Sequence, residues 1–156
     1  IMIGGSESAV ARARPFFELL GKNIVHVGPS GAGQVAKACN QILAAVTIEG
    51  VAEALTFARA HGVDAARVRE ALLGGFAYSK VLEIHGKRML DGAYAPGFKA
   101  KLHAKDMRIV RASAAEAGLD LPCAEAASER IDRLVAEGKG ELDSSALATL
   151  FERGKA

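Results

Sequence analysis

The sequence predicts a mainly α-helical protein, with a short strand–helix–strand segment up to about residue 28 and an all-helical domain after it. Three observations predict this class. Short apolar runs suited to strands occur near the start, the apolar period becomes helical after Gly28, and glycine or proline separates the later helical segments. The chain has 156 residues, of which 50% are hydrophobic and 24% charged, as is typical of one folded domain.

The first segment is predicted as two strands that flank one helix. Ser6 can cap the start of this helix, and Gly21 can end it. Pro15 is expected to break or kink it near Arg14, because proline lacks the backbone N–H that a helix needs. The predicted ranges are Ile1–Ile3, Glu7–Leu20 and Asn23–Val27.

The next segment is predicted as one long helix from Ala32 to about Ala60, interrupted only by Gly50. It would be ~40 Å long at 1.5 Å per residue. Because it is apolar nearly all round, we expect it to be buried on every face, as the central helix of the domain or partly against a second subunit. Shorter helices are predicted to follow at Ala65–Leu73, Ser79–Leu90, Lys99–Ala117, Pro122–Glu137 and Ser144–Phe151.

Charge and cysteine content exclude several classes of partner. A net charge of +2 and few aromatic residues favour neither nucleic acid nor an anionic membrane as a partner. No window approaches the ~18 uninterrupted apolar residues of a membrane span. Cys39 and Cys123, like the four histidines, show no metal-ligand spacing, so we expect no metal site and a reducing, cytoplasmic location. The chain starts inside an apolar run without a targeting segment, so we expect it to be a piece of a longer protein.

A glycine-rich turn joins the second strand to the long helix. Gly28, Gly31 and Gly33 are spaced i, i+3 and i+5, whereas the dinucleotide fingerprint needs i, i+2 and i+5. The spacing therefore favours a tight connection in which small residues let two backbones approach each other. The alternative is an anion facing the free amides at the start of the helix.

Polar side chains interrupt the long helix at two places. Lys37, Asn40 and Gln41 share one face, where the lysine either extends into water or lines a polar cleft. The two neighbouring amides favour the cleft, in which the ammonium could transfer a proton to or from a carbonyl oxygen. Glu49 and Glu53 could form an acid–base pair, but a solvated stripe or pairing with basic residues of neighbouring helices is favoured.

A basic run lies between Phe98 and Asp106. It could bind phosphate, or it could be a solvated helix face whose charge Asp106 balances. On a helix, Lys101 and Lys105 would share one face, and His103 would lie on another together with Asp106. The spacing alone leaves the two interpretations open.

Gly28–Gln41 resembles the second signature of the β-hydroxyacid dehydrogenases, a family that includes 3-hydroxyisobutyrate dehydrogenases. Phe98–Asp106 is similar to another block of this family, and Glu141–Leu147 is similar to the tail of its tartronate semialdehyde reductases. The resemblance implies that residues 1–28 end a Rossmann domain that lies mostly upstream. It also implies that residues 29–156 form a helical bundle for substrate binding and dimerisation, built around one long helix as in 6-phosphogluconate dehydrogenase.

The resemblance also implies roles for single residues. Lys37 matches the catalytic lysine of the family, which acts as the general acid and base. The other implied roles are substrate binding by Asn40, Gln41 and Asp106, and contact with NAD or NADP by Lys105 and Phe98. The cofactor would be bound mainly by the missing domain, so the isolated chain is expected to be inactive.

The activity that the resemblance implies is reduction of tartronate semialdehyde (2-hydroxy-3-oxopropanoate) to glycerate by hydride transfer, in a homodimer or homotetramer. Alternatives within the family are 3-hydroxyisobutyrate dehydrogenase and glyoxylate or succinic semialdehyde reductase. An alternative of another class is a non-catalytic helical dimerisation module. In such a module Lys37 would be a surface residue that extends into water.

Overall fold

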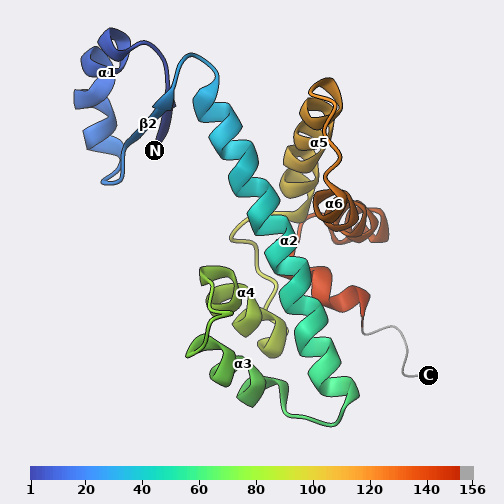
Figure 1. Ribbon diagram of the computed structural model, residues 1–156. Helices are drawn as coiled ribbons and strands as arrows, with labels where there is room; N and C mark the ends of the chain where they lie inside the picture. Colours follow the sequence, from blue (N-terminus) through green and yellow to red (C-terminus); the bar gives the residue numbers. More distant parts are fainter. Residues whose placement is uncertain (152–156) are drawn as a thin grey trace. The chain divides into compact units, whose positions relative to one another are not determined.

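The computed structural model describes residues 1–151; the final residues of the predicted helical domain, 152–156, lie outside the described residues. The chain is mostly helical, with two parallel strands (Figure 1). It divides into two compact units, Ile1–Gln41 and the residues from Ile42 onward. The division falls inside the longest helix, α2 (Ala32–Ala60).

The first unit contains the predicted strand–helix–strand segment. Strands β1 (Met2–Gly4) and β2 (Val25–Gly28) are parallel, and α1 (Glu7–Leu20) connects them. Ser6 caps α1 as predicted, because its hydroxyl accepts a hydrogen bond from the Ala9 N–H at 3.3 Å. The Cα partners are Met2 with Val25, Ile3 with His26, and Gly4 with Gly28, with a register shift after Ile3.

The break expected at Pro15 does not occur. Helix α1 continues through Pro15 to Leu20 without interruption. A proline inside a helix removes the hydrogen bond to the carbonyl four residues earlier, here that of Ala11. Ala11 and Pro15 are both exposed, so water can hydrogen-bond to this carbonyl and the cost of the missing bond is reduced.

The glycine turn brings two backbones into contact, as predicted. A Cβ atom on Gly33 would lie 2.9 Å from the Met2 carbonyl oxygen, and one on Gly4 would lie 2.6 Å from the Pro29 carbonyl oxygen. Real Cβ atoms do not approach this closely, so both positions require glycine. The start of α2 therefore packs directly on β1, which explains why the first unit extends beyond residue 28.

The second unit consists of the rest of α2 and the shorter helices. Helix α5 packs against α6, α3 against α4, and the last helical turn, η2, contacts α4 and α6. Helix α6 ends three residues earlier than predicted and continues as a π-helical turn, η1, because Gly138 adopts a positive φ of 79°. The bounds are α3 Ala65–Leu73, α4 Lys80–Asp91, α5 Ala100–Glu116, α6 Pro122–Leu134, η1 Val135–Lys139 and η2 Ser144–Leu150, a 3₁₀ helix.

Helix α2 is buried on one face only, so the expectation of burial on every face is wrong for the single chain. A stripe at helical spacing, including Ile48, Ala52 and Leu55, belongs to the core. In contrast, Leu43 and Phe57 are 69% and 66% exposed. The sequence overestimated burial because apolar composition does not show how much cover the neighbouring helices provide.

By length and composition alone, α2 could also cross a membrane, although the core helix of a soluble protein passes the same test. Its most apolar window is 44% buried inside the fold. Glu49, on the same helix, forms an ion pair with Arg130 of α6. Both observations favour a core helix.

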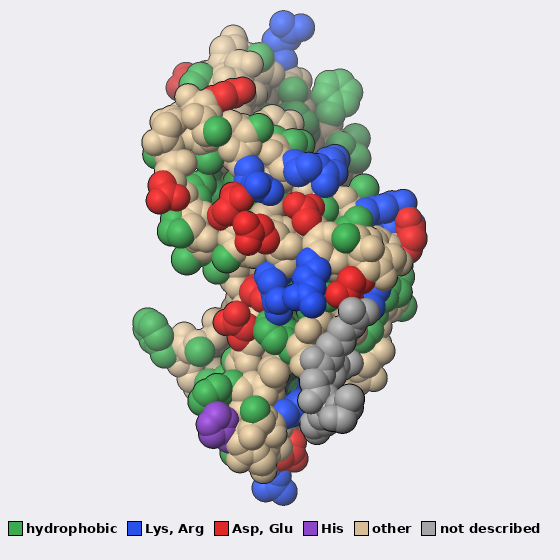
Figure 2. Space-filling model, turned by 90° about the vertical axis from the view of Figure 1, so that its right-hand side faces the viewer, with side chains coloured by type: hydrophobic (Ala, Val, Ile, Leu, Met, Phe, Trp, Pro, Cys, Tyr) green, Lys and Arg blue, Asp and Glu red, His purple; other side chains and the backbone are tan. Residues whose placement is uncertain are grey.

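Charged side chains of both signs are interspersed on the face that Figure 2 shows. Ion pairs connect α5 to α6 on the surface of the second unit. Arg111 lies 2.6 Å from Glu125 and 3.6 Å from Asp132, and Arg108 lies 3.5 Å from Asp132. These pairs are largely exposed, so we expect each to contribute little to stability.

Candidate functional site

Lys37, Asn40 and Gln41 meet on one face of α2. The Gln41 Oε1 atom accepts hydrogen bonds from Lys37 Nζ and from Asn40 Nδ2, each at 2.9 Å. Gln41 is buried, with 4% of its surface exposed, whereas Lys37 and Asn40 are exposed. A fixed, buried amide oxygen therefore orients a lysine ammonium and a second amide that remain accessible to a ligand.

Lys37 also lines an open cleft of about 490 Å³ within the first unit. The cleft is bounded by β1, by Phe17 of α1 and by the start of α2. Both backbone groups and apolar side chains line it, so it could hold a small ligand with a polar end. Lys37 lines this cleft while its side chain stays accessible to water.

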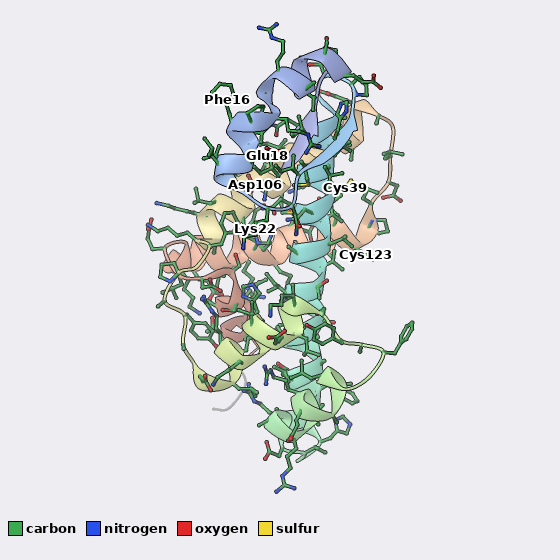
Figure 3. All side chains as sticks on the ribbon, turned by 90° about the vertical axis from the view of Figure 1, so that its left-hand side faces the viewer. Phe16, Glu18, Lys22, Cys39, Asp106 and Cys123 are labelled. Atoms are coloured by element: carbon green, nitrogen blue, oxygen red, sulfur yellow. The ribbon has the colours of Figure 1, made fainter. Side chains whose placement is uncertain are left out.

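In the second unit, Lys105 and Asp106 form an ion pair on α5, with Lys105 Nζ 2.7 Å from Asp106 Oδ1. The Asp106 side chain is mostly buried, with 16% exposed, and the lysine is exposed. Leu102 and Ile109 belong to the same helical stripe and are exposed as well. One stripe of α5 thus combines a cation, a carboxylate and apolar surface. Figure 3 labels Asp106 on this helix.

The remaining basic residues of the run do not form a common phosphate site. Lys99 Nζ lies 2.9 Å from a carboxylate oxygen of Glu141, and Lys101 pairs with the other oxygen. Hydrogen bonds from Lys101 and Lys99 lower the pKa of Glu141 to about 2. His103 is buried and its Nδ1 atom lies 3.1 Å from Ser144 Oγ, so it belongs to the core.

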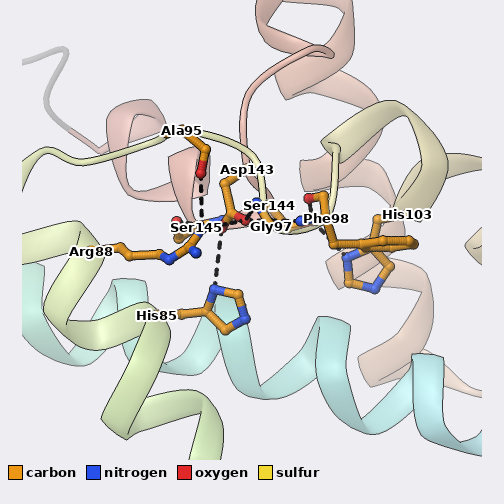
Figure 4. A network of polar contacts seen from close by, with 9 residues as sticks. All are labelled: His85, Arg88, Ala95, Gly97, Phe98, His103, Asp143, Ser144 and Ser145. Carbon is orange, nitrogen blue, oxygen red and sulfur yellow. Dashed lines mark hydrogen bonds and ion pairs between the residues drawn. The ribbon is translucent and has the colours of Figure 1, made fainter.

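Phe98 is held through Asp143, the residue just before the last predicted helix. Asp143 caps η2, as its Oδ1 atom accepts a hydrogen bond from Ser145 N at 3.0 Å. Its Oδ2 atom also accepts the backbone N–H of Phe98 at 3.1 Å (Figure 4). Burial alone would raise the pKa of Asp143, but hydrogen bonds from His85, Ser145 and Phe98 hold it well below its usual range. Asp143 and Phe98 are 45 positions apart, so no local pattern could have revealed this contact.

The carboxylate pair of α2 serves the structure, as the sequence favoured. Glu49 Oε1 accepts a hydrogen bond from Arg130 Nε at 2.9 Å, and Glu53 is exposed. Burial raises the pKa of Glu49, and the neighbouring Arg130 opposes that shift. Glu49 is thus a partner for a basic residue of a neighbouring helix.

Metal ligands are not grouped within residues 1–151, because no cluster of three or more His, Cys, Asp or Glu side chains there could hold an ion. The two cysteines, Cys39 on α2 and Cys123 on α6, are exposed free thiols (Figure 3). The predicted site residues offer an ammonium and two amides in the first unit, and an ammonium, a carboxylate and an aromatic ring in the second.

The fold and the site define a class of protein. The chain belongs to the family of the NAD-binding domain of NADP-dependent 3-hydroxyisobutyrate dehydrogenase, whose model matches residues 31–151. The matched region contains Lys37, Asn40 and Gln41 as well as Phe98, Lys105 and Asp106. Membership of this family confirms the resemblance inferred from the sequence.

Individual proteins are similar to the chain over nearly its whole length. The chain is 48% identical to the 2-hydroxy-3-oxopropionate reductase of Escherichia coli (strain K12) over 152 residues, which is 97% of this chain and 52% of the reductase. It is 35% identical to an NAD-dependent L-serine dehydrogenase of Pseudomonas aeruginosa, covering 97% of this chain and 53% of that enzyme. The chain therefore spans about half the length of the curated relatives that it matches.

Solved structures share the fold. A 3-hydroxyisobutyrate dehydrogenase from Salmonella typhimurium superposes with a TM-score of 0.88 at 27% identity, over 94% of this chain and 52% of that one. The 3-hydroxyisobutyrate dehydrogenase of Mycobacterium tuberculosis with L-serine gives a TM-score of 0.86 at 29% identity, over 94% of this chain and 53% of that one.

Proposed function

We propose that this chain is the helical half of an NAD(P)-dependent β-hydroxyacid dehydrogenase that reduces tartronate semialdehyde to glycerate. The observation that carries the proposal is the hydrogen-bonded cluster of Lys37, Asn40 and Gln41, whose lysine lines an open cleft. The similarity to the Escherichia coli reductase of the same substrate, at 48% identity, supports the choice of substrate.

Lys37 is the proposed general acid in this direction. Its ammonium donates a proton to the substrate carbonyl oxygen as that oxygen gains negative charge, and in the reverse reaction the neutral amine takes the hydroxyl proton. Gln41 holds Nζ through its buried amide oxygen, which reduces the number of orientations that the flexible lysine can adopt. Asn40 lies beside the ammonium and can hydrogen-bond to the substrate.

The second unit offers residues that fit a nicotinamide nucleotide. Phe98 presents a partly exposed ring, which suits a flat aromatic group, and the exposed ammonium of Lys105 suits a phosphate. When bound, this cofactor supplies the hydride for the carbonyl carbon. Asp106, which pairs with Lys105, keeps that lysine oriented on α5 and is the proposed substrate contact of this unit.

The test uses the full-length protein that contains this chain. Oxidation of NADH and of NADPH is followed with tartronate semialdehyde, beside the Lys37→Ala variant. We expect kcat to fall by about 10²–10⁴ in the variant, the usual contribution of a positioned acid or base, with little change in cofactor affinity. A wild-type protein that reduces succinic semialdehyde or oxidises 3-hydroxyisobutyrate or L-serine instead would correct the substrate. Activity with none of these would favour the non-catalytic dimerisation module.

A further inference from the structure

The Asp143 carboxylate joins two separate segments, with one oxygen for each. Its Oδ2 atom accepts hydrogen bonds from the backbone N–H groups of Gly97 at 3.0 Å and Phe98 at 3.1 Å, and Arg88 Nη1 lies 2.6 Å away (Figure 4). Its Oδ1 atom accepts hydrogen bonds from Ser145 N at 3.0 Å and Ser145 Oγ at 2.7 Å. The first oxygen therefore holds the loop before α5, and the second holds η2 and also lies 3.2 Å from His85 Nδ1 of α4.

That loop depends on these contacts for its conformation. Residues 93–98 lie outside any helix or strand. The backbone N–H of Asp143 donates to the Tyr94 carbonyl at 3.0 Å, and the N–H of Ser144 donates to the Phe98 carbonyl at 3.1 Å. The loop is thus attached at both ends to the residues that start η2.

Gly97 lets the carboxylate come close enough to bind the loop. A Cβ atom there would lie 3.0 Å from Arg88 Nη2 and 3.4 Å from Asp143 Oδ2. A side chain at this position would push the guanidinium or the carboxylate away from the loop N–H groups. Gly97, Arg88 and Asp143 therefore form one tightly packed cluster.

Phe98 is the residue whose backbone this cluster holds and whose ring faces outward. Its N–H is bound by Asp143, and its carbonyl accepts from Ser144 N and from Ser144 Oγ at 3.3 Å. Its ring rests edge-on against the buried His103, with 5.6 Å between the ring centroids, and is 37% exposed. A backbone bound on both sides thus carries a ring that is open to a ligand.

We propose that Asp143 is a positioning residue that fixes the backbone of Gly97 and Phe98 and thereby sets the Phe98 ring for the nicotinamide nucleotide. The inference rests on the proposed function, because it takes Phe98 as a cofactor contact. Asparagine cannot replace the aspartate here. Its side chain has one acceptor oxygen in place of two, and its NH₂ group would face either the Arg88 and loop donors or the Ser145 donors.

The test is a double-mutant cycle on cofactor affinity in the full-length protein. The Kd for NADH and NADPH is measured by nucleotide fluorescence for wild type, Asp143→Asn, Phe98→Ala and the double variant. We expect each single variant to weaken binding about tenfold, the effect of losing charge-assisted hydrogen bonds or one aromatic contact. We expect the double variant to be no weaker than Phe98→Ala, because Asp143 acts through Phe98.

Ser145→Ala is the matched control. It removes a hydrogen bond from the same buried carboxylate, but at Oδ1, so it should lower the Tm and leave the Kd within about twofold of wild type. If Asp143→Asn does not fold, Gly97→Ala disturbs the same contacts from the loop side and enters the cycle in its place.

Additive losses in the double variant, or an unchanged Kd in the folded single variants, would overturn the positioning role. A wild-type protein that binds neither nucleotide would instead overturn the proposed function, and this inference with it.

Discussion

The Lys37 ammonium lies 2.9 Å from Gln41 Oε1, one helical turn further along α2, and the same oxygen binds Asn40 at 2.9 Å. A single buried acceptor therefore organises the proposed acid and its neighbour. The amide is neutral, so it orients the lysine through a hydrogen bond and not through an ion pair.

Replacing Gln41 by methionine tests this relationship. Gln41→Met keeps a similar volume but removes the acceptor, so Lys37 becomes free to adopt other rotamers. We expect kcat of the full-length protein to fall about tenfold while the KM for the cofactor stays unchanged. The measurement is steady-state kinetics beside a thermal unfolding curve. A kcat equal to that of wild type in a folded variant would show that the lysine needs no such support.

The Glu49–Arg130 pair gives a prediction on stability. Arg130→Met leaves a mostly buried carboxylate without its partner and also removes the guanidinium that lies 4.3 Å from the Phe151 ring centroid. We expect a loss of about 2 kcal/mol in the free energy of unfolding, much of it recovered by adding Glu49→Gln. Urea unfolding measures both.

Arg108→Met is the matched control for that experiment, because its ion pair with Asp132 is largely exposed. We expect a change within about 0.5 kcal/mol. Equal losses of unfolding free energy for Arg108→Met and Arg130→Met would contradict the view that burial makes the Glu49–Arg130 pair important for stability.

Features that depend on residues close together in the sequence could be predicted, and the polar cluster of α2 is an example. Lys37, Asn40 and Gln41 lie within five positions of one helix, so helical spacing alone places them on one face. The contacts of Asp143 with Gly97 and Phe98 could not be predicted, because they form only through tertiary folding.

The buried state of His103 and the open face of α2 were missed for a related reason. Both depend on which neighbouring element covers a given helix face, and composition does not specify that. The positions of the α2 to α5 helices could be predicted because a glycine follows the end of each helix within two residues, which is a local signal.

The lowered pKa of Asp143 predicts that the free energy of unfolding falls at acid pH. Its pKa is lower in the folded chain than its ordinary value of 3.8, because hydrogen bonds from His85, Ser145 and Phe98 outweigh the opposite effect of burial. The unfolded chain therefore binds a proton more readily, and the stabilisation present above about pH 4 is lost as the pH falls toward the folded pKa. Glu141, with its pKa lowered to about 2, acts in the same direction.

We expect the free energy of unfolding of wild type to fall steeply below about pH 4, and that of Asp143→Asn to fall less. Urea unfolding at a series of pH values between about 6 and 3 measures the two slopes. Parallel curves for wild type and variant would show that other carboxylates cause the acid sensitivity.

The isolated chain of 156 residues should not turn over substrate. It spans about half of the relatives that it matches, and its glycine turn is used for packing β1 on α2. We expect no NADH or NADPH oxidation with tartronate semialdehyde above the no-enzyme rate, under conditions in which the full-length protein is active. Robust turnover by the isolated chain would mean that these residues contain a complete cofactor site.

The second unit combines an apolar groove with a protruding aromatic side chain, and this pair predicts self-association. The groove, about 660 Å³, lies between α2 and α3 beside Phe57 and Val63, which are both exposed. Phe76, in the loop between α3 and α4, is fully exposed. A groove and a projecting ring on one chain suit a symmetric contact in which each copy inserts its ring into the other. We propose that a second copy of this chain occupies the groove.

Sedimentation of the full-length protein tests this contact. We expect a dimer or larger assembly at micromolar concentration, and a shift toward monomer in Phe57→Glu and in Phe76→Ser, because each variant removes apolar surface from one side of the contact. Arg67→Glu is the control, since it changes the charge of an exposed α3 side chain that does not line the groove. A stable wild-type monomer would contradict self-association. A dimer that persists in both variants would place the contact elsewhere on the molecule.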